Sequence, residues 1–177
     1  CTANRRVMVS AGQFEPLLAA LESAAGALVW GDPLEEATRI GPVLTAGKRD
    51  DLERELAEIQ SSGRAHTIVR THGAEAAREW VRQGAYVQPA ILGCDRPEDS
   101  LVQEESMAPW LILQRAEDFD HALALCNGVR QGLIASLFGG SRELRGRFRI
   151  EARAGVLKFD QGTAGVDVTM PFGGWKS

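Results

Sequence analysis

A cysteine stands at position 1 of this 177-residue chain, directly before "TANRR", and its thiol is the strongest candidate nucleophile in the sequence. A thiolate attacks electrophilic carbon and can also depart again, which suits covalent catalysis. The residues alone allow three interpretations of Cys1. It is a processed N-terminal nucleophile, the lipidated first residue of a mature lipoprotein, or an internal catalytic cysteine of a longer enzyme. The other two cysteines, Cys94 and Cys126, are predicted to be structural.

Two later stretches hold further candidate residues. "EESMAPWL" contains the paired acids Glu104 and Glu105, and "MPFGGWKS" near the end contains Phe172. Taken alone, an acidic pair is usually a solvated loop feature and a phenylalanine usually a core residue. The three cysteines and three histidines lack the spacing of metal ligands, so no metal site is predicted. Neither a GxGxxG nor a GxxxxGK[ST] motif occurs, and the paired glycines are predicted to form turns.

Composition narrows the class of protein. The formal net charge is -4 and the sequence pI is about 5.5, which argues against binding to a nucleic-acid backbone. No apolar run approaches the ~20 residues that span a bilayer, so no membrane insertion is expected. Three scattered cysteines do not make a disulfide framework, and a reducing, cytoplasmic location is expected. Hydrophobic residues make up 44% of the chain, as in an ordinary globular core.

The first two thirds alternate between strand and helix patterns. "RRVMVS" alternates in the manner of a short strand, and apolar residues recur at helical spacing over 13–29 and 46–62. "HTIVRT" is typical of a strand, and "AEAAREWVRQ" (74–83) is predicted to form a short helix. "AYVQPAIL" (85–92) is predicted to be extended, with Pro89 placing it towards a sheet edge.

The last third predicts a regular α/β unit. Strands are predicted over 110–114, 133–138 and 155–160, and helices over 117–129 and 141–152. Ser141 is the predicted N-cap of the second helix. Short connections between these elements predict adjacent parallel strands with right-handed crossovers. The fold class is therefore α/β, a mostly parallel open sheet flanked by helices. Asp160 and the long glycine-rich loop after it are expected at the carboxyl end of a strand, where such sheets place their sites.

Six segments together resemble the aldehyde dehydrogenase superfamily. "CTANRR" resembles the stretch at its nucleophile, and "EESMAPWL" resembles its E-E-x-F-G-P-[VL] motif. The other segments, each similar to a motif of that family in the same order, are "GDPLEEATRIGPVLTAGKRDDL", "YVQPAILG", "CNGVRQGLIASLF" and "AGVLKFDQ…MPFGGWKS". The likeness runs from Cys1 to Ser177.

The resemblance implies an activity and roles for four residues. Cys1 would be the catalytic nucleophile of an NAD(P)-dependent oxidation of an aldehyde or semialdehyde to the acid, through a thiohemiacetal and a thioester. Glu105 would bind the nicotinamide ribose hydroxyls of NAD or NADP, and Met107 would pack against the cofactor ring. Phe172 would line the aldehyde pocket. Asn127 and Gly132 are expected to shape a turn between helix and strand.

Two positions depart from the family pattern. Met107-Ala108-Pro109 replaces the usual Phe-Gly-Pro, and Ala108 would constrain the backbone if a positive φ were needed there. Asp160 stands where the family usually has Asn. A carboxylate close to the catalytic thiol and unscreened would raise the pKa of that thiol.

The resemblance also implies an organisation. Residues 1–177 would be the thiol-bearing catalytic domain. The nucleotide-binding domain, the general-base glutamate and the oxyanion-holding asparagine would lie upstream, absent from this chain, so the chain alone is predicted to be inactive. Expected partners are a small aldehyde, the protein's own nucleotide-binding domain and further copies in a homodimer or homotetramer, with no nucleic acid and no membrane.

Two rival classes remain as alternatives. An N-terminal-cysteine hydrolase would use the α-amine of Cys1 as its base, but such enzymes are built from antiparallel sheets, against the parallel pattern expected here. A non-enzymatic domain, lipid-anchored through Cys1, would leave "EESMAP" and "MPFGGWKS" without a purpose.

Overall fold

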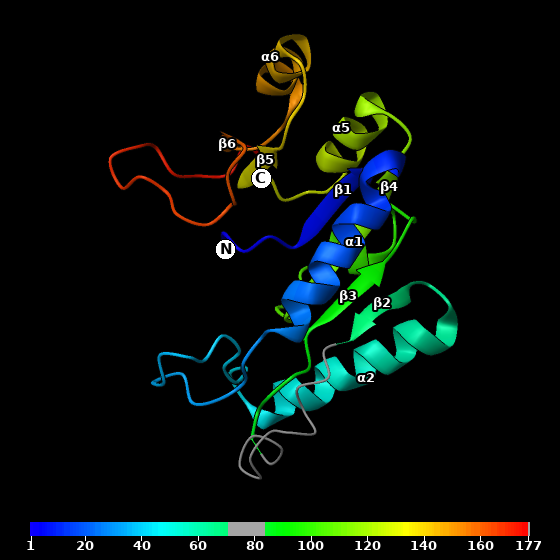
Figure 1. Ribbon diagram of the computed structural model, residues 1–177, viewed down its shortest axis with the longest axis vertical. Helices are drawn as coiled ribbons and strands as arrows, with labels where there is room; N and C mark the ends of the chain where they lie inside the picture. Colours follow the sequence, from blue (N-terminus) through cyan, green and yellow to red (C-terminus); the bar gives the residue numbers. More distant parts are fainter. Residues whose placement is uncertain (71–83, 177) are drawn as a thin grey trace. The chain divides into compact units, whose positions relative to one another are not determined.

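The computed structural model describes residues 1–70 and 84–176, and the chain divides into two compact units. The first unit consists of Cys1–Gly12 and Gln114–Ser177, and the second of Gln13–Leu113. Two elements, α1 (Ala11–Gly26) and β4 (Trp110–Ala116), run from one unit into the other (Figure 1). Each unit is described by itself.

The second unit contains most of a mixed sheet and its covering helices. Besides α1 and β4 its elements are α2 (Ala46–Ser62), β2 (His66–Arg70), β3 (Ala90–Gly93) and the short α4 (Ser100–Gln103). β3 lies between β2 and β4, antiparallel to β2 and parallel to β4. The register pairs Gly93 with His66 on one side and with Leu113 on the other. All four residues of β3 are buried, so this strand forms the centre of the unit.

α2 covers this sheet because its apolar residues fall on one face. Leu52, Leu56 and Ile59 recur at spacings of three and four, and all three are buried. The helix begins where the side chain of Thr45 accepts a hydrogen bond from the Lys48 amide. It ends at Gly63, whose φ of 64° lies in the left-handed region that glycine adopts freely.

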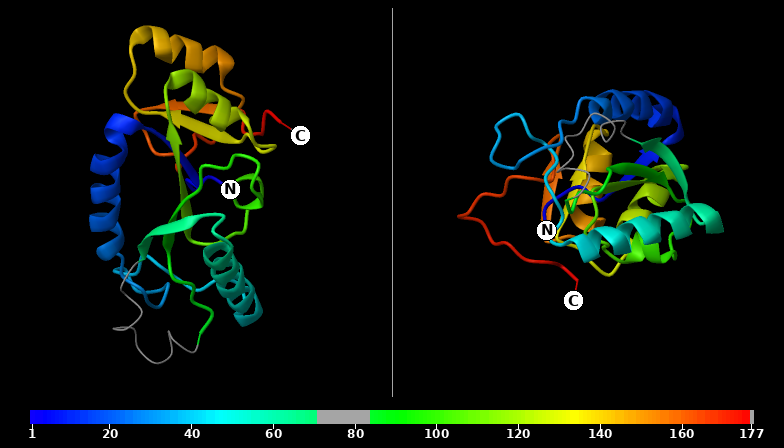
Figure 2. Two further views of the ribbon diagram at one scale, coloured as in Figure 1. Left: turned by 90° about the vertical axis from the view of Figure 1, so that its right-hand side faces the viewer. Right: turned by 90° about the horizontal axis from the view of Figure 1, so that it is seen from below.

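The first unit contains a separate pair of parallel strands. Its elements are β1 (Arg6–Ser10), the end of β4, α5 (Phe119–Asn127), β5 (Ile134–Leu137), α6 (Arg142–Glu151) and β6 (Val156–Phe159). β5 and β6 run parallel and form a two-stranded sheet, with Ile134 beside Val156 and Leu137 beside Phe159. Both helices lie on one side of this pair (Figure 2). The Phe148 and Phe159 rings meet edge to face at 5.7 Å, which packs α6 onto β6.

Most predicted elements are confirmed, including the α/β class. Ser141 caps α6 by accepting from the Leu144 amide, as predicted. The first helix ends at Gly26, earlier than the predicted Val29. The predicted helix over 74–83 lies outside the described residues, and α4 was not predicted at all.

Two predictions about strand pairing are wrong. β4, β5 and β6 do not form one sheet, because both edges of β4 are taken, by β1 and by β3, and β5 pairs with β6 instead. β3 is an interior strand and not an edge strand. Pro89 is compatible with that position because it precedes the strand and so removes no donor from the ladder.

Candidate functional site

Cys1 is exposed and lies a few residues before β1. The start of that strand is anchored by Arg6, whose Nε and Nη2 donate to Gln114 Oε1 at 3.1 and 2.7 Å. Nη2 also donates to the carbonyl of Leu125 in α5 at 2.7 Å. Burial lowers the pKa of Arg6 to about 10, so the guanidinium stays charged at neutral pH. These bonds tie the segment that bears Cys1 to β4 and α5.

The other two cysteines are less exposed than Cys1, since Cys94 is buried and Cys126 is partly covered. Cys94 is fully buried in the second unit, and burial raises the pKa of its thiol. Burial likewise raises the pKa of Cys126 on α5, against the opposing charge of Arg6. A raised pKa leaves less thiolate at neutral pH, so neither group is suited to nucleophilic attack. Both therefore fit the structural role predicted for them.

Asp160 follows β6 and has a structural task of its own. Its φ of 51° lies in the left-handed region, which Asp and Asn tolerate better than most residues. The carboxylate accepts from the Gly139 amide at 2.7 Å and from Arg145 Nη2 at 2.5 Å. These two donors, the amide first, lower the pKa of Asp160. Its charge is thus paired with a guanidinium, so it is not the unscreened acid that would raise the pKa of a nearby thiol.

Phe172 lies in the loop 160–176, which is held at its far end by backbone and side-chain contacts. The Trp175 amide donates to the Gly132 carbonyl at 3.0 Å, and Lys176 Nζ donates to the carbonyls of Asn127 and Val129 at 2.8 and 2.6 Å. Phe172 itself is 48% exposed. A half-exposed ring on an anchored loop can present an apolar wall to a ligand.

The end of this loop lies against the connection into β6. A Cβ on Gly155 would overlap the carbonyl oxygen of Gly173, so only glycine fits there. Asn127 joins α5 to the end of α6, because its amide donates to the Glu151 carbonyl and accepts from the Arg153 amide. Asn127 thus ties the connection after α5 to the connection after α6, and the Gly132 carbonyl adds to this tie by accepting from the amides of Gly155 and Trp175.

Glu105 and Met107 belong to the second unit, on the segment between α4 and β4. α4 begins at Asp99, whose side chain accepts from the Leu101 amide, and Leu101 and Val102 are buried. Glu105 is exposed and Met107 is 71% exposed. The positive φ in this segment falls on Met107, at 57°, and not on Ala108. The alanine that departs from the family pattern is thus unstrained.

The four predicted site residues divide equally between the two units. Cys1 and Phe172 lie in the first unit, and Glu105 and Met107 in the second. Sequence reasoning missed Arg6, Lys158 and Lys176, whose side chains hold the segments that carry Cys1 and Phe172. The available signal was a lysine inside the otherwise apolar strand "VLKF", next to a glycine-rich loop.

The described residues contain a hollow of about 540 Å³ in the second unit, lined by the end of α2 and by β2 and β3 residues such as His66 and Gly93. It contains none of the predicted site residues. Within 1–70 and 84–176 no cluster of His, Cys, Asp and Glu could hold a metal ion. In the same residues no helix combines the length and apolar character needed to cross a bilayer.

Two curated proteins that are similar to this chain are both dehydrogenases of semialdehydes. An alpha-ketoglutaric semialdehyde dehydrogenase from Bacillus subtilis is 30% identical over 99% of this chain and 36% of its own length. An N-succinylglutamate 5-semialdehyde dehydrogenase from Novosphingobium aromaticivorans is 31% identical over 98% of this chain and 36% of its own length. The chain therefore spans about a third of the length of these relatives.

Solved structures share the fold. A putative aldehyde dehydrogenase from Burkholderia cenocepacia superposes with a TM-score of 0.84 at 30% identity, over 97% of this chain and 35% of that one. Betaine aldehyde dehydrogenase from Staphylococcus aureus, solved in complex with NAD+, superposes with a TM-score of 0.84 at 21% identity, over 97% and 33%. The sequence model of the aldehyde dehydrogenase family matches residues 1–177. The chain therefore belongs to the aldehyde dehydrogenase family.

Proposed function

We propose that the protein containing this chain oxidises an aldehyde to the carboxylic acid, with NAD or NADP as the electron acceptor. The observation that carries the proposal is the exposed Cys1 thiol, ahead of an anchored strand in the unit whose last loop bears Phe172. The names of the curated relatives, which are dehydrogenases of semialdehydes and aldehydes, support it. Neither rival class gains support, since the family match covers the whole chain.

The chemistry of Cys1 follows from its thiol. The thiolate adds to the aldehyde carbon, a carbon–sulfur bond forms, and the carbonyl electrons move to oxygen to give a thiohemiacetal. NAD or NADP, when bound, supplies the acceptor for the hydride that this adduct loses. The acyl group is then held on Cys1 as a thioester. Water attacks the thioester carbon, the carbon–sulfur bond breaks, and the acid departs while the thiol is restored.

Glu105 and Met107 fit the nicotinamide end of the cofactor by their chemistry. An exposed carboxylate accepts hydrogen bonds from a pair of ribose hydroxyls, and an exposed thioether packs against a flat ring. In the intact protein, Glu105→Gln should raise the KM for the cofactor by about tenfold and leave the KM for the aldehyde unchanged. Glu104→Gln is the matched control and should change neither value. An unaltered cofactor KM in Glu105→Gln would remove this role.

The substrate is proposed to be a semialdehyde. Both relatives cited first act, by their names, on molecules that carry an aldehyde at one end and acidic groups elsewhere. A panel of semialdehydes of increasing chain length, assayed with each cofactor, would identify the preferred member. Higher kcat/KM for simple alkyl aldehydes than for every semialdehyde tested would exclude this substrate class.

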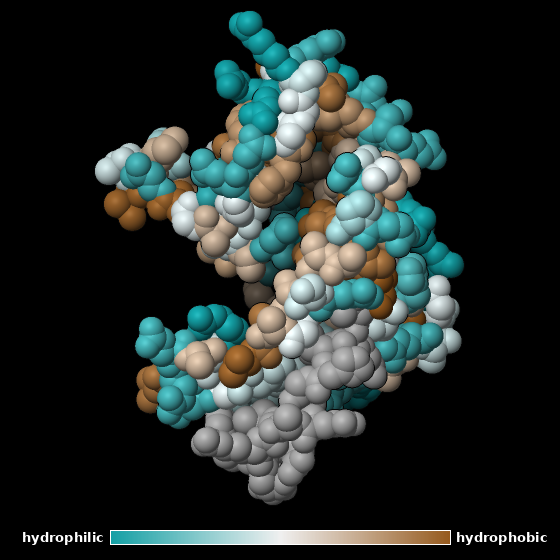
Figure 3. All heavy atoms as spheres, viewed as in Figure 1, coloured by the Kyte–Doolittle hydropathy of each residue, from teal (hydrophilic) through white to brown (hydrophobic). Residues whose placement is uncertain are grey.

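The larger organisation is also proposed. A nucleotide-binding domain would accompany this thiol-bearing domain in a cytoplasmic homodimer or homotetramer. Exposed apolar side chains support burial against further protein, since Val168 is 98% exposed, Ile150 84% and Phe138 66%. Hydrophobic surface is visible on the loop that projects after β6 (Figure 3). Size-exclusion chromatography of the intact protein should give an oligomer, and a monomer alone would contradict this.

The nucleophile itself is tested by substitution and by trapping. Cys1→Ala should lower aldehyde oxidation by about a thousandfold or more, because no other side chain replaces the thiol. Cys126→Ala is the matched control, and its activity should stay within about twofold of the parent, since the proposed chemistry does not use that thiol. Mass spectrometry of the protein stopped during turnover should place the acyl group on Cys1. An adduct on any other residue would overturn the mechanism.

A further inference from the structure

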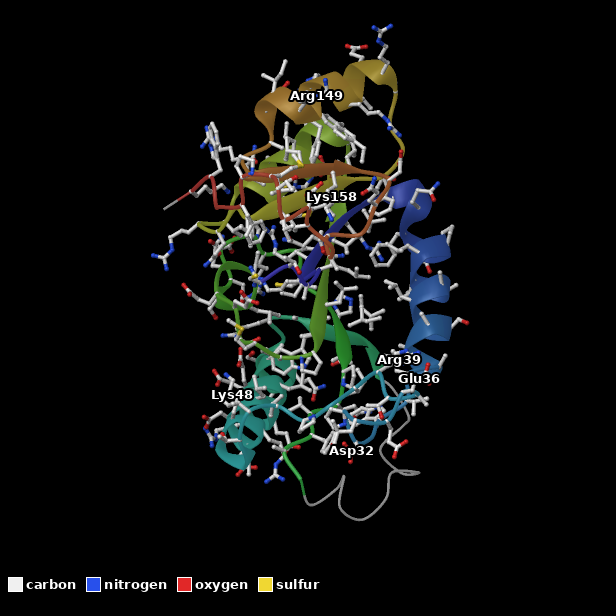
Figure 4. The ribbon with its side chains drawn as sticks, turned by 90° about the vertical axis from the view of Figure 1, so that its left-hand side faces the viewer. Asp32, Glu36, Arg39, Lys48, Arg149 and Lys158 are labelled. Carbon is white, nitrogen blue, oxygen red and sulfur yellow. The ribbon has the colours of Figure 1, made fainter. Side chains whose placement is uncertain are left out.

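Lys158 of β6 holds four successive carbonyl oxygens of the loop that follows its own strand (Figure 4). Its Nζ donates to the carbonyls of Gly162, Thr163, Ala164 and Gly165 at 3.1, 3.3, 2.7 and 2.5 Å. An ammonium has three N–H groups, so at least one is shared between two oxygens. Four carbonyl dipoles that converge on one point repel each other, and a cation at that point is what keeps them together.

The neighbouring strand completes the arrangement. Ser136 of β5 is the register partner of Lys158, and its hydroxyl donates to the Gln161 carbonyl at 2.6 Å. Two adjacent side chains on paired strands therefore satisfy five consecutive loop carbonyls, from 161 to 165. These carbonyls belong to no helix or strand, so the loop takes its path from the two side chains and not from its own backbone pattern.

The position of this cluster links it to the candidate site. Gly165 is seven residues before Phe172, and the far end of the loop is fixed separately by Trp175 and Lys176. Between these two anchors the backbone turns at Asp167, whose carboxylate accepts from the amide and the hydroxyl of Thr169. Release of the Lys158 anchor would free the near half of the loop and change where Phe172 lies.

We propose that the carbonyls of 162–165 form a monovalent-cation site that the Lys158 ammonium fills, and that Lys158 is thereby a positioning residue for the loop bearing Phe172. The effect on aldehyde binding rests on the proposed function, whereas the effect on the loop does not. Lys158 is not proposed to contact any reacting atom. Its charge acts through the backbone of the loop.

The first test measures the loop directly, in the intact protein without substrate. Chymotrypsin cleavage within 161–175, after Phe172, should become about tenfold faster in Lys158→Met, which keeps an apolar stem but no charge. Lys48→Met, in the second unit, is the control and should cleave at the parent rate. Ser136→Ala, which loses one of the five bonds, should give a smaller increase. Equal cleavage rates for Lys158→Met and the parent would overturn the proposal, whatever the enzyme's activity.

The second test asks whether a free cation can replace the ammonium group of Lys158. Lys158→Ala leaves space among the four carbonyl oxygens. Ammonium chloride at about 0.1–0.2 M should therefore slow the cleavage of this variant towards the parent rate. Choline chloride should not, because its cation is too large to enter that space. Lys158→Met fills that space and should not be rescued. If equal ionic strengths of both salts protected Lys158→Ala equally, screening and not a cation site would be the cause.

The third test measures whether the Lys158 anchor of the loop affects the KM for the aldehyde. In Lys158→Ala the KM for the aldehyde should rise about tenfold while the KM for the cofactor stays unchanged, and ammonium chloride should reverse the rise. Lys158→Arg, which restores a cation, should lie between the parent and Lys158→Ala. An unchanged aldehyde KM together with faster cleavage would separate the loop from the substrate pocket and overturn that half of the proposal. A protein that oxidises no aldehyde would fail the proposed function while the cleavage tests still decide the cation site.

Discussion

β3 and β5 are strands of equal length and similar composition, "AILG" and "IASL", yet they differ in burial. Every residue of β3 is buried, whereas every residue of β5 is only partly covered, as is every residue of its partner β6. The second unit thus closes an apolar core around its central strand. The first unit keeps its two-stranded sheet in place with polar anchors, namely Asn127, Asp160, Lys158 and Lys176.

The comparison predicts which substitutions each unit tolerates. Apolar truncation should damage the second unit most, because a buried cavity costs more than a half-exposed one. Loss of polar anchors and of close backbone packing should damage the first unit most. The following experiments test this difference.

The largest effect is expected from Leu92→Ala in β3. Leu92 is fully buried, so the free energy of unfolding should fall by about 2–5 kcal/mol. Leu157→Ala in β6 is the matched control, and its partly covered side chain should lose about 1 kcal/mol. Urea denaturation of both variants measures the difference. Equal losses would show that the two sheets are packed alike.

An intermediate effect is expected from Gly155→Ala. The added Cβ would overlap the Gly173 carbonyl, and the loop end must move, at a cost of about 1–3 kcal/mol in the free energy of unfolding. Gly146→Ala, inside α6, meets no atom within 4 Å and should stabilise by about 0.5–1 kcal/mol through helix propensity. Thermal denaturation should therefore move in opposite directions for the two variants. A neutral Gly155→Ala would mean that the loop end is not held against the entry to β6.

The smallest effect is expected at Asp160, and it depends on pH. Its pKa is lowered in the folded protein from an ordinary value of 3.8, first by the Gly139 amide and then by Arg145. A carboxylate with a lowered pKa stabilises the fold fully above its ordinary pKa, and this stabilisation is lost as pH falls through the lower folded value. The parent should thus exceed Asp160→Asn in thermal midpoint at neutral pH, with the gap closing below pH 3.8.

Arg145→Gln supplies the matched background for that measurement. Without the guanidinium, the gap between Asp160 and Asn should shrink at neutral pH, because the Gly139 amide can bond either side chain. A gap that is unchanged by Arg145→Gln, or that persists in acid, would show that the pair with Arg145 contributes nothing.

The helices and strands were predicted well because they depend on local signals in the sequence. The pairing between strands far apart in the sequence was predicted less well. Ser141 and the apolar spacing of α2 act over a few residues, so their outcome could be read from the chain. The partner of β5 could not, because it depends on β1 and β3 already occupying both sides of β4. The same limit explains Pro89, which was assigned to an edge on a rule that ignores where the strand begins.

The candidate site shows the same division. Family motifs marked Cys1, Glu105, Met107 and Phe172, but the side chains that hold their segments were not marked. Arg6 reaches residues more than a hundred positions away, and Lys158 acts on carbonyls whose direction no sequence pattern reveals. The expected strain at Ala108 also depended on backbone geometry, and the positive φ fell one residue earlier, on Met107.

The unequal shielding of the three sulfur atoms has a practical consequence. Cys1 is exposed, whereas Cys94 is buried and Cys126 is partly covered. A maleimide dye added at one equivalent to the native protein should therefore react first at Cys1. Because the dye consumes the Cys1 thiol, an aldehyde held covalently on that sulfur would slow the labelling, and the labelling rate would report how much of the thiol is free.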